Sequence, residues 1–397
     1  MNIIYHHRTR GLGAEGTHVK AIVDALRLQG HGVKILAFPG VSPENKVVPN
    51  ASVDNAAPKK HIAMLQWLAG LTKNAPIFVF ELFEILYNLM IPFRLNKAIN
   101  EEKPAFIYER YSLFMFAGVW LANKRSIPII LEVNDSVLVS RIRLLVFGYL
   151  AKKVERWVFT HCTGIVFVST YFRDLAVNEF GAISKTVVCP NAAELSKFDL
   201  SRYDKDSVKK SLGLEGKILC GYTGGFGQWH GIVWFVEKII PKIKSHPTFG
   251  LLLVGDGASF NDVREVIKNA GMEHQIVLTG RVNHDDIPRY LAAMDFGILP
   301  DLNAYCSPMK LFESMAMAQG MVLPGSDPVK EVVIDGGTSW LFPVNDQDAC
   351  IDKVMAVFGD AAQRNQVGKE ARAYIERERQ WTHNVDLIFT LLEKPNV

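Results

Sequence analysis

Short apolar runs alternate with amphipathic segments along the first half of the chain. The runs lie at residues 3–7, 32–38, 106–110, 128–134, 164–169 and 186–192. Runs of this length are typical of strands buried on both faces of a sheet. Residues 17–29 instead repeat their apolar positions at helical spacing, and Gly30 follows as a helix terminator. Strands that alternate with helices predict a parallel sheet covered by helices.

The same alternation starts again after a charged, irregular segment at 196–210. The later apolar runs lie at 217–224, 249–257, 275–282, 296–301 and 320–326. A chain of 397 residues is long for one core, so we expect two domains, at 1–198 and 199–379. The predicted fold class is α/β, with two Rossmann-like, doubly wound domains facing each other across a cleft. Ligands of such sheets bind beyond the carboxyl ends of the strands.

Composition narrows the class of protein. The net charge is +3, from 44 basic and 41 acidic residues, and no Lys/Arg run resembles a nucleic-acid-binding arm. The five cysteines are widely spaced and include no CxxC pair, which argues against a disulfide framework or a zinc site. The first apolar run is too short for a signal peptide. These features favour a cytoplasmic protein without nucleic-acid partners.

The most apolar stretch of the sequence is 75–93, which Glu81 and Glu84 interrupt. The two acids make it a poor membrane span. It is either an amphipathic helix packed on its own domain or a surface that docks on a membrane. Docking would place the protein on the inner face of the cytoplasmic membrane.

A glycine-rich turn, GLGAEG at 11–16, joins the first strand to the first helix. The spacing matches the dinucleotide-binding pattern, but the next strand ends in LAFPG, without the acid that would bind a nicotinamide ribose. NAD(P) is therefore not expected. Gly13 and Gly16 would still let the backbone approach a phosphate or a sugar. The alternative is a tight turn with no ligand.

The segment YCSPMKLFESMAMAQG, 305–320, predicts a helix with a lysine in its first turn. Ser307 fits the N-cap, Pro308 fits the first helical position, and the helix should run to about residue 318. The unpaired backbone N–H groups at 307–310, including that of Met309, and the Lys310 ammonium would form an anion site. Glu313 lies one turn further on, where it could accept ribose hydroxyls. The alternative is a surface Lys–Glu pair.

Several motifs together resemble those of the family 4 glycosyltransferases of the GT-B fold. The specific match is SPMKLFESMAMAQGMVLPGSDPVKEVV at 307–333. Weaker matches are GAEGTHVKAIVDALRLQGHGVKIL (13–36), VVCPNAAELSKFDL (187–200), LLLVGDG (251–257), VLTGRVNHDDIPRYLAAMDFGILP (277–300) and RQWTHNVDLIF (379–389). The resemblance implies transfer of a sugar from a nucleotide sugar, with retention at the anomeric carbon and without a metal or cofactor. It also implies that a final helix, 380–394, packs back on the N-terminal domain.

The resemblance assigns roles on the donor side. Glu313 matches the second glutamate of the family's E-x7-E motif, which holds the ribose, whereas Tyr305 stands in place of the first glutamate. Gly225 and His230 stand where many relatives carry an Arg and a Lys on the diphosphate. Lys310 then becomes the main phosphate cation, with His230 assisting if protonated. The remaining expected donor contacts are Phe226, Arg281, Val282 and Leu311.

On the acceptor side, Asn134 stands where the family often has a histidine. Asn134, Glu132 and Arg110 would position the acceptor hydroxyl, beside Asp135. Retention could use Glu132 as a nucleophile. It could also proceed by front-face attack, in which the leaving phosphate takes the acceptor proton. The HDD at 284–286 is interpreted as a helix cap rather than a metal motif.

The resemblance implies a hexosyltransferase that uses a UDP-sugar, although GDP is not excluded by the residues. The acceptor would be a saccharide or lipid-linked saccharide in exopolysaccharide or cell-envelope polysaccharide synthesis. Two alternatives stay open. A nucleotide-sugar epimerase can share this fold, and a catalytically inactive partner that binds sugar nucleotides would explain the missing first glutamate.

Overall fold

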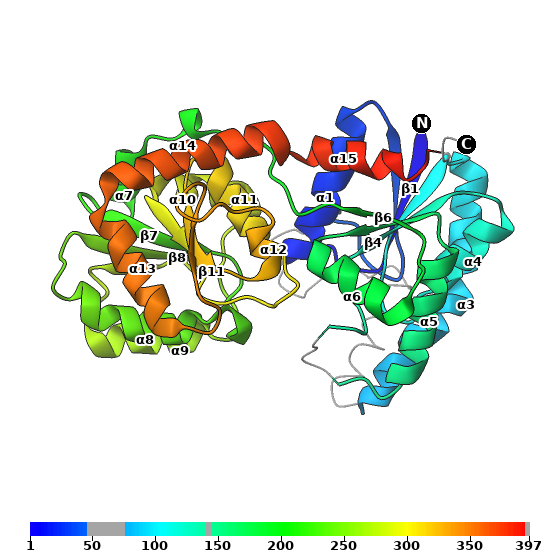
Figure 1. The fold of residues 1–397 in the computed structure, drawn as a ribbon, viewed down its shortest axis with the longest axis horizontal. Coiled ribbons are helices and arrows are strands. Elements are labelled where there is room, and N and C mark those ends of the chain that lie inside the picture. Colours follow the sequence, from blue (N-terminus) through cyan, green and yellow to red (C-terminus); the bar gives the residue numbers. More distant parts are fainter. Residues whose placement is uncertain (46–75, 140–143, 394–397) are drawn as a thin grey trace, which may run out of the picture. The chain divides into compact units, whose positions relative to one another are not determined.

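The computed structural model describes residues 1–45, 76–139 and 144–393, which form two parallel sheets flanked by helices (Figure 1). Contacts divide the chain into two compact units. Unit 1 comprises Met1–Phe167, Phe172–Cys189 and Val385–Val397, and unit 2 comprises Val168–Tyr171 and Pro190–Asn384. Apart from the short Val168–Tyr171 segment, the change from unit 1 to unit 2 thus falls at 189/190, ahead of the charged 196–210 segment.

Unit 1 contains a six-stranded parallel sheet in the order β2-β1-β3-β4-β5-β6. Its strands are β1 (Asn2–His7), β2 (Gly32–Ala37), β3 (Phe106–Arg110), β4 (Ile129–Val133), β5 (Gly164–Phe167) and β6 (Lys185–Val188). The six predicted apolar runs each overlap one of these strands. The chain passes from β1 outward to β2 and then returns to β3 on the other side of β1. The topological switch point therefore lies between β1 and β3.

The helices associated with unit 1 are α1 (Gly13–Leu28), α3 (Ile77–Glu102), α4 (Ala117–Lys124), α5 (Gly148–His161), α6 (Thr170–Phe180) and α15 (Trp381–Thr390). Helix α1 begins at Gly13, four residues before the predicted start at 17. Gly16 thus lies inside the helix, and a Cβ there would stand 2.3 Å from the Gly11 carbonyl oxygen. Gly16 lets the helix pack against the turn, and this close contact explains why position 16 is a glycine without requiring a ligand.

Helix α3 turns its polar residues inward. The buried Glu81 carboxylate accepts the N–H groups of Val146 and Phe147, at 2.8 and 2.7 Å, where α5 begins. The Asn88 side-chain oxygen accepts those of Phe116 and Ala117, at 2.9 and 3.0 Å, where α4 begins. Both side chains satisfy helix N-termini that would otherwise be unpaired. Glu81 and Asn88 are therefore helix caps, whereas Glu84 pairs with Arg8 at 3.0 Å, and apolar residues are left on the outer face.

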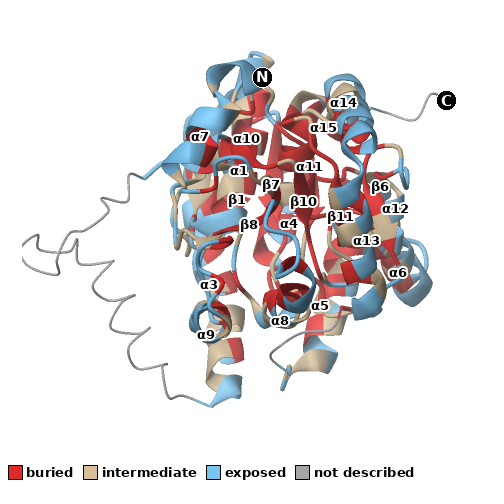
Figure 2. Cartoon of the chain, turned by 90° about the vertical axis from the view of Figure 1, so that its left-hand side faces the viewer, coloured by how far each residue is buried: buried red, intermediate tan, exposed pale blue. Residues whose placement is uncertain are grey.

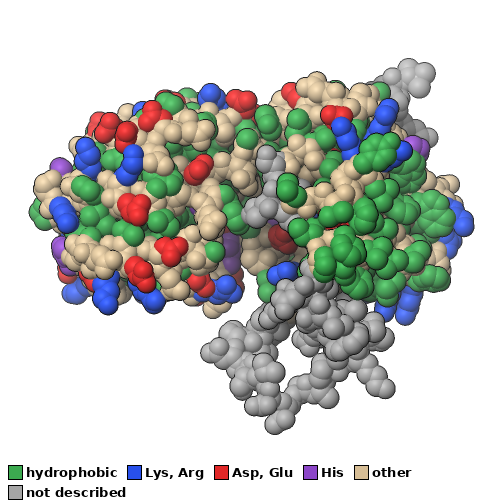
Figure 3. Space-filling model, turned by 90° about the horizontal axis from the view of Figure 1, so that it is seen from below, with side chains coloured by type: hydrophobic (Ala, Val, Ile, Leu, Met, Phe, Trp, Pro, Cys, Tyr) green, Lys and Arg blue, Asp and Glu red, His purple; other side chains and the backbone are tan. Residues whose placement is uncertain are grey.

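The predicted 75–93 helix is thus packed on its own unit through Ile91 and Leu95, and Ala75 lies outside the described residues. Its outer face exposes Leu89 (67%) and Phe93 (80%). Figure 3 shows hydrophobic side chains gathered on one face of unit 1. Within the described ranges, no helix combines the length and apolar character that a membrane crossing requires.

Unit 2 contains a second six-stranded parallel sheet, in the order β12-β11-β10-β7-β8-β9. Its strands are β7 (Ile218–Thr223), β8 (Phe249–Val254), β9 (Ile276–Leu278), β10 (Phe296–Ile298), β11 (Met321–Pro324) and β12 (Trp340–Phe342). The sequence predicted the first five of these strands and missed the short β12. The chain runs from β7 through β8 to β9 and then returns to β10 on the other side of β7. The switch point of this sheet lies between β7 and β10.

The helices of unit 2 are α7 (Lys205–Ser211), α8 (Ile232–Ile243), α9 (Phe260–Ala270), α10 (Ile287–Ala293), α11 (Met309–Ala316), α12 (Asp327–Lys330), α13 (Gln347–Gly359) and α14 (Ala361–Glu378), with 3-10 turns η1 (Leu200–Arg202), η2 (Gln228–His230) and η3 (His284–Asp286). The central strands of both sheets are buried and the edge strands β2, β6 and β9 only partly so, while the outer faces of the helices are exposed (Figure 2). The predicted pair of doubly wound parallel sheets is confirmed.

The last part of α15 returns to unit 1. The Phe389 ring lies 5.6 Å from that of Phe106, and the Gln29 amide donates to Asp386 at 2.8 Å. These contacts confirm that the C-terminal helix packs back on the N-terminal unit.

Candidate functional site

The candidate donor site begins with two glycine loops at the carboxyl ends of β7 and β8. Gly224 follows β7 and Gly255 follows β8, and a Cβ on Gly255 would stand 1.9 Å from the Gly224 carbonyl oxygen. Gly255 also has φ +137, a conformation that suits glycine. Only glycine permits this approach, so the YTGG and VGDG sequences bring the two loops into contact beside the switch point.

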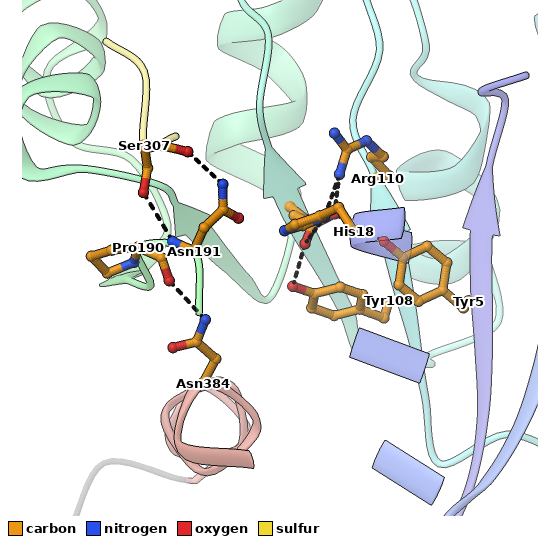
Figure 4. A network of polar contacts seen from close by, with 9 residues as sticks. Tyr5, His18, Tyr108, Arg110, Pro190, Asn191, Ser307 and Asn384 are labelled. Carbon is orange, nitrogen blue, oxygen red and sulfur yellow. Dashed lines mark hydrogen bonds and ion pairs between the residues drawn. The ribbon is translucent and has the colours of Figure 1, made fainter. Parts of the chain in front are cut away.

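The start of α11 differs from the prediction. Pro308 occupies the N-cap and Met309 begins the helix, which ends at Ala316 rather than near 318. Ser307 makes no capping bond, because its hydroxyl accepts the Asn191 backbone N–H at 3.0 Å. The Asn191 side chain donates to the Ser307 carbonyl at 2.5 Å (Figure 4). Ser307 therefore anchors the loop before α11 instead of capping the helix.

Pro190, which precedes Asn191, is also anchored by a side-chain hydrogen bond. The Asn384 side chain donates to the Pro190 carbonyl at 2.8 Å (Figure 4). Asn191 and Asn384 thus fix, within unit 2, the segment against which the α11 loop rests. This anchoring sets the position of the first turn of α11.

The Lys310 side chain extends from that first turn to β7. Its Nζ donates to the Tyr222 hydroxyl at 2.9 Å and lies 4.2 Å from the centre of the Tyr222 ring. A Cβ on Gly224 would stand 2.9 Å from the same Nζ, so the ammonium lies over the first glycine loop. Burial lowers the pKa of Lys310 to about 8. In the part of the chain that the structure describes, this ammonium forms no ion pair with a carboxylate.

Backbone donors lie beside the ammonium. Among the described residues, no acceptor receives the N–H of Met309 or of Lys310, whereas the Leu311 N–H is bonded to the Pro308 carbonyl. Pro308 has no N–H of its own. Two free N–H groups and one unpaired ammonium form a compact positive site at the carboxyl ends of β7 and β10, suited to a diphosphate.

His230 does not supply the positive charge that we considered for it. Burial, followed by the neighbouring Lys310, lowers the pKa of His230 to about 3, so the ring is neutral near pH 7. Its Nδ1 lies 2.8 Å from the Gly225 carbonyl oxygen, which also accepts the Tyr222 hydroxyl at 2.7 Å. His230 and Tyr222 therefore hold the Gly225 loop in shape, and Lys310 is left as the cation.

Glu313 lies on the same face of α11 and is nearly buried. Its Oε1 lies 2.8 Å from His284 Nε2, and His284 Nδ1 lies 2.7 Å from Lys197 Nζ. His284 opens the HDD sequence that we interpreted as a helix cap. Asp286 does stand at the N-cap of α10, but its side chain makes no capping bond there. The main contact of this sequence is with Glu313, which the sequence did not predict.

The other four predicted donor residues differ in how exposed their side chains are. Phe226 and Leu311 are fully buried, and their side chains pack in the core of unit 2 rather than toward a ligand. Val282 packs against the same core. Arg281 is exposed and lies 3.6 Å from Asp256. Arg281 is thus the one of these four whose side chain is exposed to a nucleotide base.

In unit 1, a buried polar cluster lies at the ends of β1, β3 and β4. Glu132 Oε2 accepts both the Tyr5 hydroxyl and Arg110 Nη1, each at 2.9 Å, and Oε1 accepts the Tyr108 hydroxyl at 3.3 Å. The sheet register places these residues together, since Tyr5 pairs with Tyr108 and Arg110 pairs with Glu132. Figure 4 shows the tyrosine, arginine and His18 side chains of this cluster converging.

His18 covers the cluster from α1. Arg110 donates to His18 Nδ1 at 2.7 Å, and burial lowers the pKa of His18 to about 4. Burial opposes ionisation of Glu132, yet His18, Arg110 and the Tyr5 hydroxyl together lower the pKa of its carboxyl. Both oxygens of Glu132 are occupied in this arrangement. The geometry favours an anchoring role for Glu132, which holds Arg110, over the nucleophile that the sequence allowed.

Two other predicted residues of unit 1 offer groups to a ligand. The Asn134 Nδ2 is buried and, among the described residues, has no hydrogen-bonding partner. Gly13 has φ +61 and open space where a Cβ would point, so a ligand could approach the start of α1. Asp135 instead accepts the Ser136 N–H at 2.9 Å. Asn134 follows β4 directly, at the edge of the sheet where ligands are expected.

Sequence reasoning missed Tyr222, His284, His18 and Asn191. Tyr222 and His18 lie inside a strand and a helix whose patterns indicate only burial. His284 and Asn191 contact residues far away in the sequence, at Glu313 and Ser307. In the sequence, a polar residue at the end of a predicted strand is the pattern that indicates a site residue. Of these four residues, only Asn191 has that position. Within the described residues, no three His, Cys, Asp or Glu side chains are grouped to hold a metal ion.

Comparison with protein families identifies two models that match successive parts of the chain. A model described as "Glycosyltransferase Family 4" matches residues 15–197, and one described as "Glycosyl transferases group 1" matches residues 217–360. The candidate donor residues 222–313 fall inside the second match. His18, Arg110, Glu132 and Asn134 fall inside the first match, and Tyr5 lies before it.

Individual relatives are distant. The chain is 26% identical to 2-deoxystreptamine glucosyltransferase of Streptomyces kanamyceticus over 39% of this chain and 41% of that protein. It is 22% identical to alpha-monoglucosyldiacylglycerol synthase of Streptococcus pneumoniae over 55% of this chain and 51% of that protein. The matched regions therefore span about half the length of these curated relatives or less. Among solved structures, Alr3699/HepE of Anabaena in complex with UDP has a TM-score of 0.70 at 14% identity, covering 99% of this chain and 100% of that one.

Proposed function

Because the chain belongs to the group 1, family 4 glycosyltransferases, we propose that it transfers a hexose from a nucleotide diphosphate sugar with retention at the anomeric carbon. The observation that carries this proposal is the start of α11. There, the unpaired Lys310 ammonium and two free N–H groups lie one turn before a nearly buried glutamate, Glu313. Diphosphate at the positive site and ribose at Glu313 match the two polar parts of a nucleotide diphosphate.

The donor chemistry follows from charge. Breaking the anomeric bond leaves negative charge on the departing diphosphate, which must be stabilised more in the transition state than before it. Lys310 and the N–H groups of Met309 and Lys310 are directed at this group and are held by Tyr222 and the Asn191–Ser307 contact. UDP is the proposed nucleotide, because the similar HepE structure contains UDP. Arg281 would contact the base.

Unit 1 is proposed to bind the acceptor. Asn134 offers a buried, unsatisfied donor, and Arg110 is held by Glu132 next to it in the sheet. Glu132 has both oxygens occupied, so we favour front-face attack, in which a leaving-phosphate oxygen takes the proton of the acceptor hydroxyl. That route needs no base from the protein. Residues of unit 2 are proposed to bind the donor.

The proposed acceptor is a saccharide or lipid-linked saccharide of cell-envelope or extracellular polysaccharide. The outer face of α3 supports the lipid-linked form, since it presents Leu89 and Phe93 to solvent. Near it, the exposed Tyr149 ring at the start of α5 lies 4.5 Å from the Lys153 ammonium. Apolar and aromatic residues flanked by lysine are typical of surfaces that dock on anionic lipid. We expect the protein to cosediment with phosphatidylglycerol vesicles, and the double variant Leu89→Glu/Phe93→Glu to remain in the supernatant.

Product analysis tests the function directly. Purified protein is incubated with UDP-, GDP- or ADP-hexose and a mixture of saccharide and lipid-linked acceptors, and the products are analysed by mass spectrometry and NMR. We expect release of one nucleoside diphosphate together with a new glycoside that keeps the anomeric configuration of the donor. Lys310→Met should lower the rate at which both products form by about 100- to 1,000-fold. An epimerised donor, or an unchanged donor in every mixture, would contradict the proposal and support an epimerase or an inactive binding partner, respectively.

A further inference from the structure

A chain of three side chains leads from the surface of unit 2 to Glu313, and the proposed function does not use its first two members. Lys197 Nζ lies 2.7 Å from His284 Nδ1, and His284 Nε2 lies 2.8 Å from Glu313 Oε1. We propose that Lys197 and His284 are positioning residues that orient the Glu313 carboxylate toward the ribose hydroxyls of the donor. This inference rests on the proposed function, because it assigns the residues that prepare the same donor site.

The contacts fix the direction of each hydrogen bond. A lysine ammonium has donors and no lone pair, so the Nδ1 atom that it meets must be the acceptor. The single proton of the neutral imidazole then lies on Nε2, where it donates to the Glu313 carboxylate. Lys197 thus sets the tautomer of His284, and the tautomer delivers an N–H to Glu313.

The ring is held from other sides too. Phe198 follows Lys197 and contacts the imidazole edge-on, with 6.4 Å between ring centres. Lys197 also forms an ion pair with Asp285 at 2.8 Å, which keeps its ammonium next to the ring. Residues 197–198 lie between β6 and η1, in a segment that the sequence resemblance marked only as the end of the first domain. The structure gives this segment a contact with the donor site.

The contact with His284 fixes the orientation of the Glu313 carboxylate. Its side chain is 8% exposed, and a nearly buried carboxylate is costly unless it is hydrogen-bonded. In the described part of the chain, the His284 N–H is the donor that satisfies it, and this bond occupies Oε1. Oε2 is left to accept a hydroxyl. With the carboxylate fixed in this way, less rotational freedom is lost when the ribose binds.

Binding of two nucleotides separates this role from a general structural one. Calorimetry compares UDP with 2′,3′-dideoxy-UDP, which lacks both ribose hydroxyls, in the wild type and in His284→Ala, Lys197→Met and Glu313→Gln. We expect His284→Ala to weaken UDP binding about 5- to 10-fold, the range of one hydrogen bond, while dideoxy-UDP binding stays unchanged. Lys197→Met should act in the same direction with a smaller effect. His284→Gln, whose amide can still donate to Glu313, should recover part of the loss.

The matched control is Lys238→Met, which removes a lysine that pairs with Asp348 at 2.7 Å between α8 and α13. It should leave both nucleotide affinities unchanged. If His284→Ala weakens UDP and dideoxy-UDP binding equally, or weakens neither, the positioning role is overturned. The donor site itself still stands if Glu313→Gln weakens binding of UDP more than binding of dideoxy-UDP. If Glu313→Gln itself weakens both ligands equally, the ribose assignment in the proposed function fails instead.

Discussion

The two polar clusters at the ends of the strands differ in whether their charges are balanced. In unit 1, the buried Arg110 is paired with Glu132, and two tyrosine hydroxyls complete the hydrogen bonding of that carboxylate. In unit 2, within the described residues, the Lys310 ammonium donates to the neutral Tyr222 hydroxyl and pairs with no carboxylate. One cluster is complete without a ligand, whereas the other has a cation that an anion would complete.

This difference indicates what each cluster is built for. A balanced ion pair inside a sheet fixes geometry, because each partner holds the other in place and neither is available for a new charge. An unpaired ammonium with a lowered pKa stores unfavourable desolvation energy that a diphosphate would relieve. We therefore interpret unit 1 as a shaped surface for a neutral acceptor and unit 2 as the site of charge development.

The largest effect is expected from removing the cation. Lys310→Met should lower turnover of the nucleotide sugar by about 100- to 1,000-fold, the range for loss of one group that stabilises developing charge. Lys310→Arg keeps the charge and should retain more activity than Lys310→Met. Initial rates of nucleotide release measure both variants. Turnover of Lys310→Met within a few-fold of that of the Lys238→Met control would show that the cluster in unit 2 does not stabilise the leaving group.

Substitutions in the Glu132–Arg110 cluster of unit 1 should lower the free energy of unfolding. Glu132→Ala leaves Arg110 buried without its counter-charge, so we expect a loss of about 3–5 kcal/mol in the free energy of unfolding of unit 1. Tyr5→Phe removes one hydrogen bond and should cost about 1 kcal/mol. Denaturant unfolding followed by calorimetric scans gives both values. If Glu132→Ala instead unfolds like the wild type and loses all turnover, Glu132 acts as a nucleophile and the anchoring role is wrong.

A smaller effect is expected from pH. The pKa of Lys310 in the ligand-free protein is about 8, and a bound diphosphate raises it, so UDP affinity should be constant below pH 8 and fall as the pH rises through that value. The slope approaches about tenfold per pH unit, as expected for one linked proton. Binding of UDP to Lys310→Arg should be flat over the same window. Affinity of the wild type that rises above pH 8 would contradict an ionised Lys310 in the complex.

The contribution of Lys310 to folding stability changes with pH in the opposite direction to UDP affinity. The folded-state pKa of Lys310 lies below the ordinary lysine value of 10.5, so the unfolded chain binds more protons between about pH 8 and that value. The contribution of Lys310 to stability therefore increases with pH in this window, while donor affinity decreases. The two trends separate a ligand effect from partial unfolding.

The sequence predicted the strands because a strand buried on both faces is a local, continuous apolar run. It also placed Lys310 and Glu313 on one face of a helix, since that spacing is local. It did not predict the start of α11, because the Ser307 hydroxyl is engaged by Asn191, which lies 116 residues away in the sequence. Competition between a local cap and a distant partner cannot be read from the local pattern.

The same limit explains the other differences. Glu81 interrupts an apolar run, and the local pattern gave it no partner, yet it caps the start of α5, 65 residues further along. His284 and Glu313 are 29 residues apart and meet because β10 and α11 return the chain to the end of β9. Residues whose role depends on tertiary contacts were missed, and residues whose role depends on local spacing were found.

Calorimetric binding of UDP, GDP and ADP, with a chelator present, to the wild type and to Glu313→Ala tests the donor site at α11. We expect one nucleotide to bind to the wild type and Glu313→Ala to weaken its binding about tenfold or more, because this carboxylate accepts ribose hydroxyls. Absence of binding by all three nucleotides, or equal binding by both proteins, would contradict the assignment of α11 as the donor site.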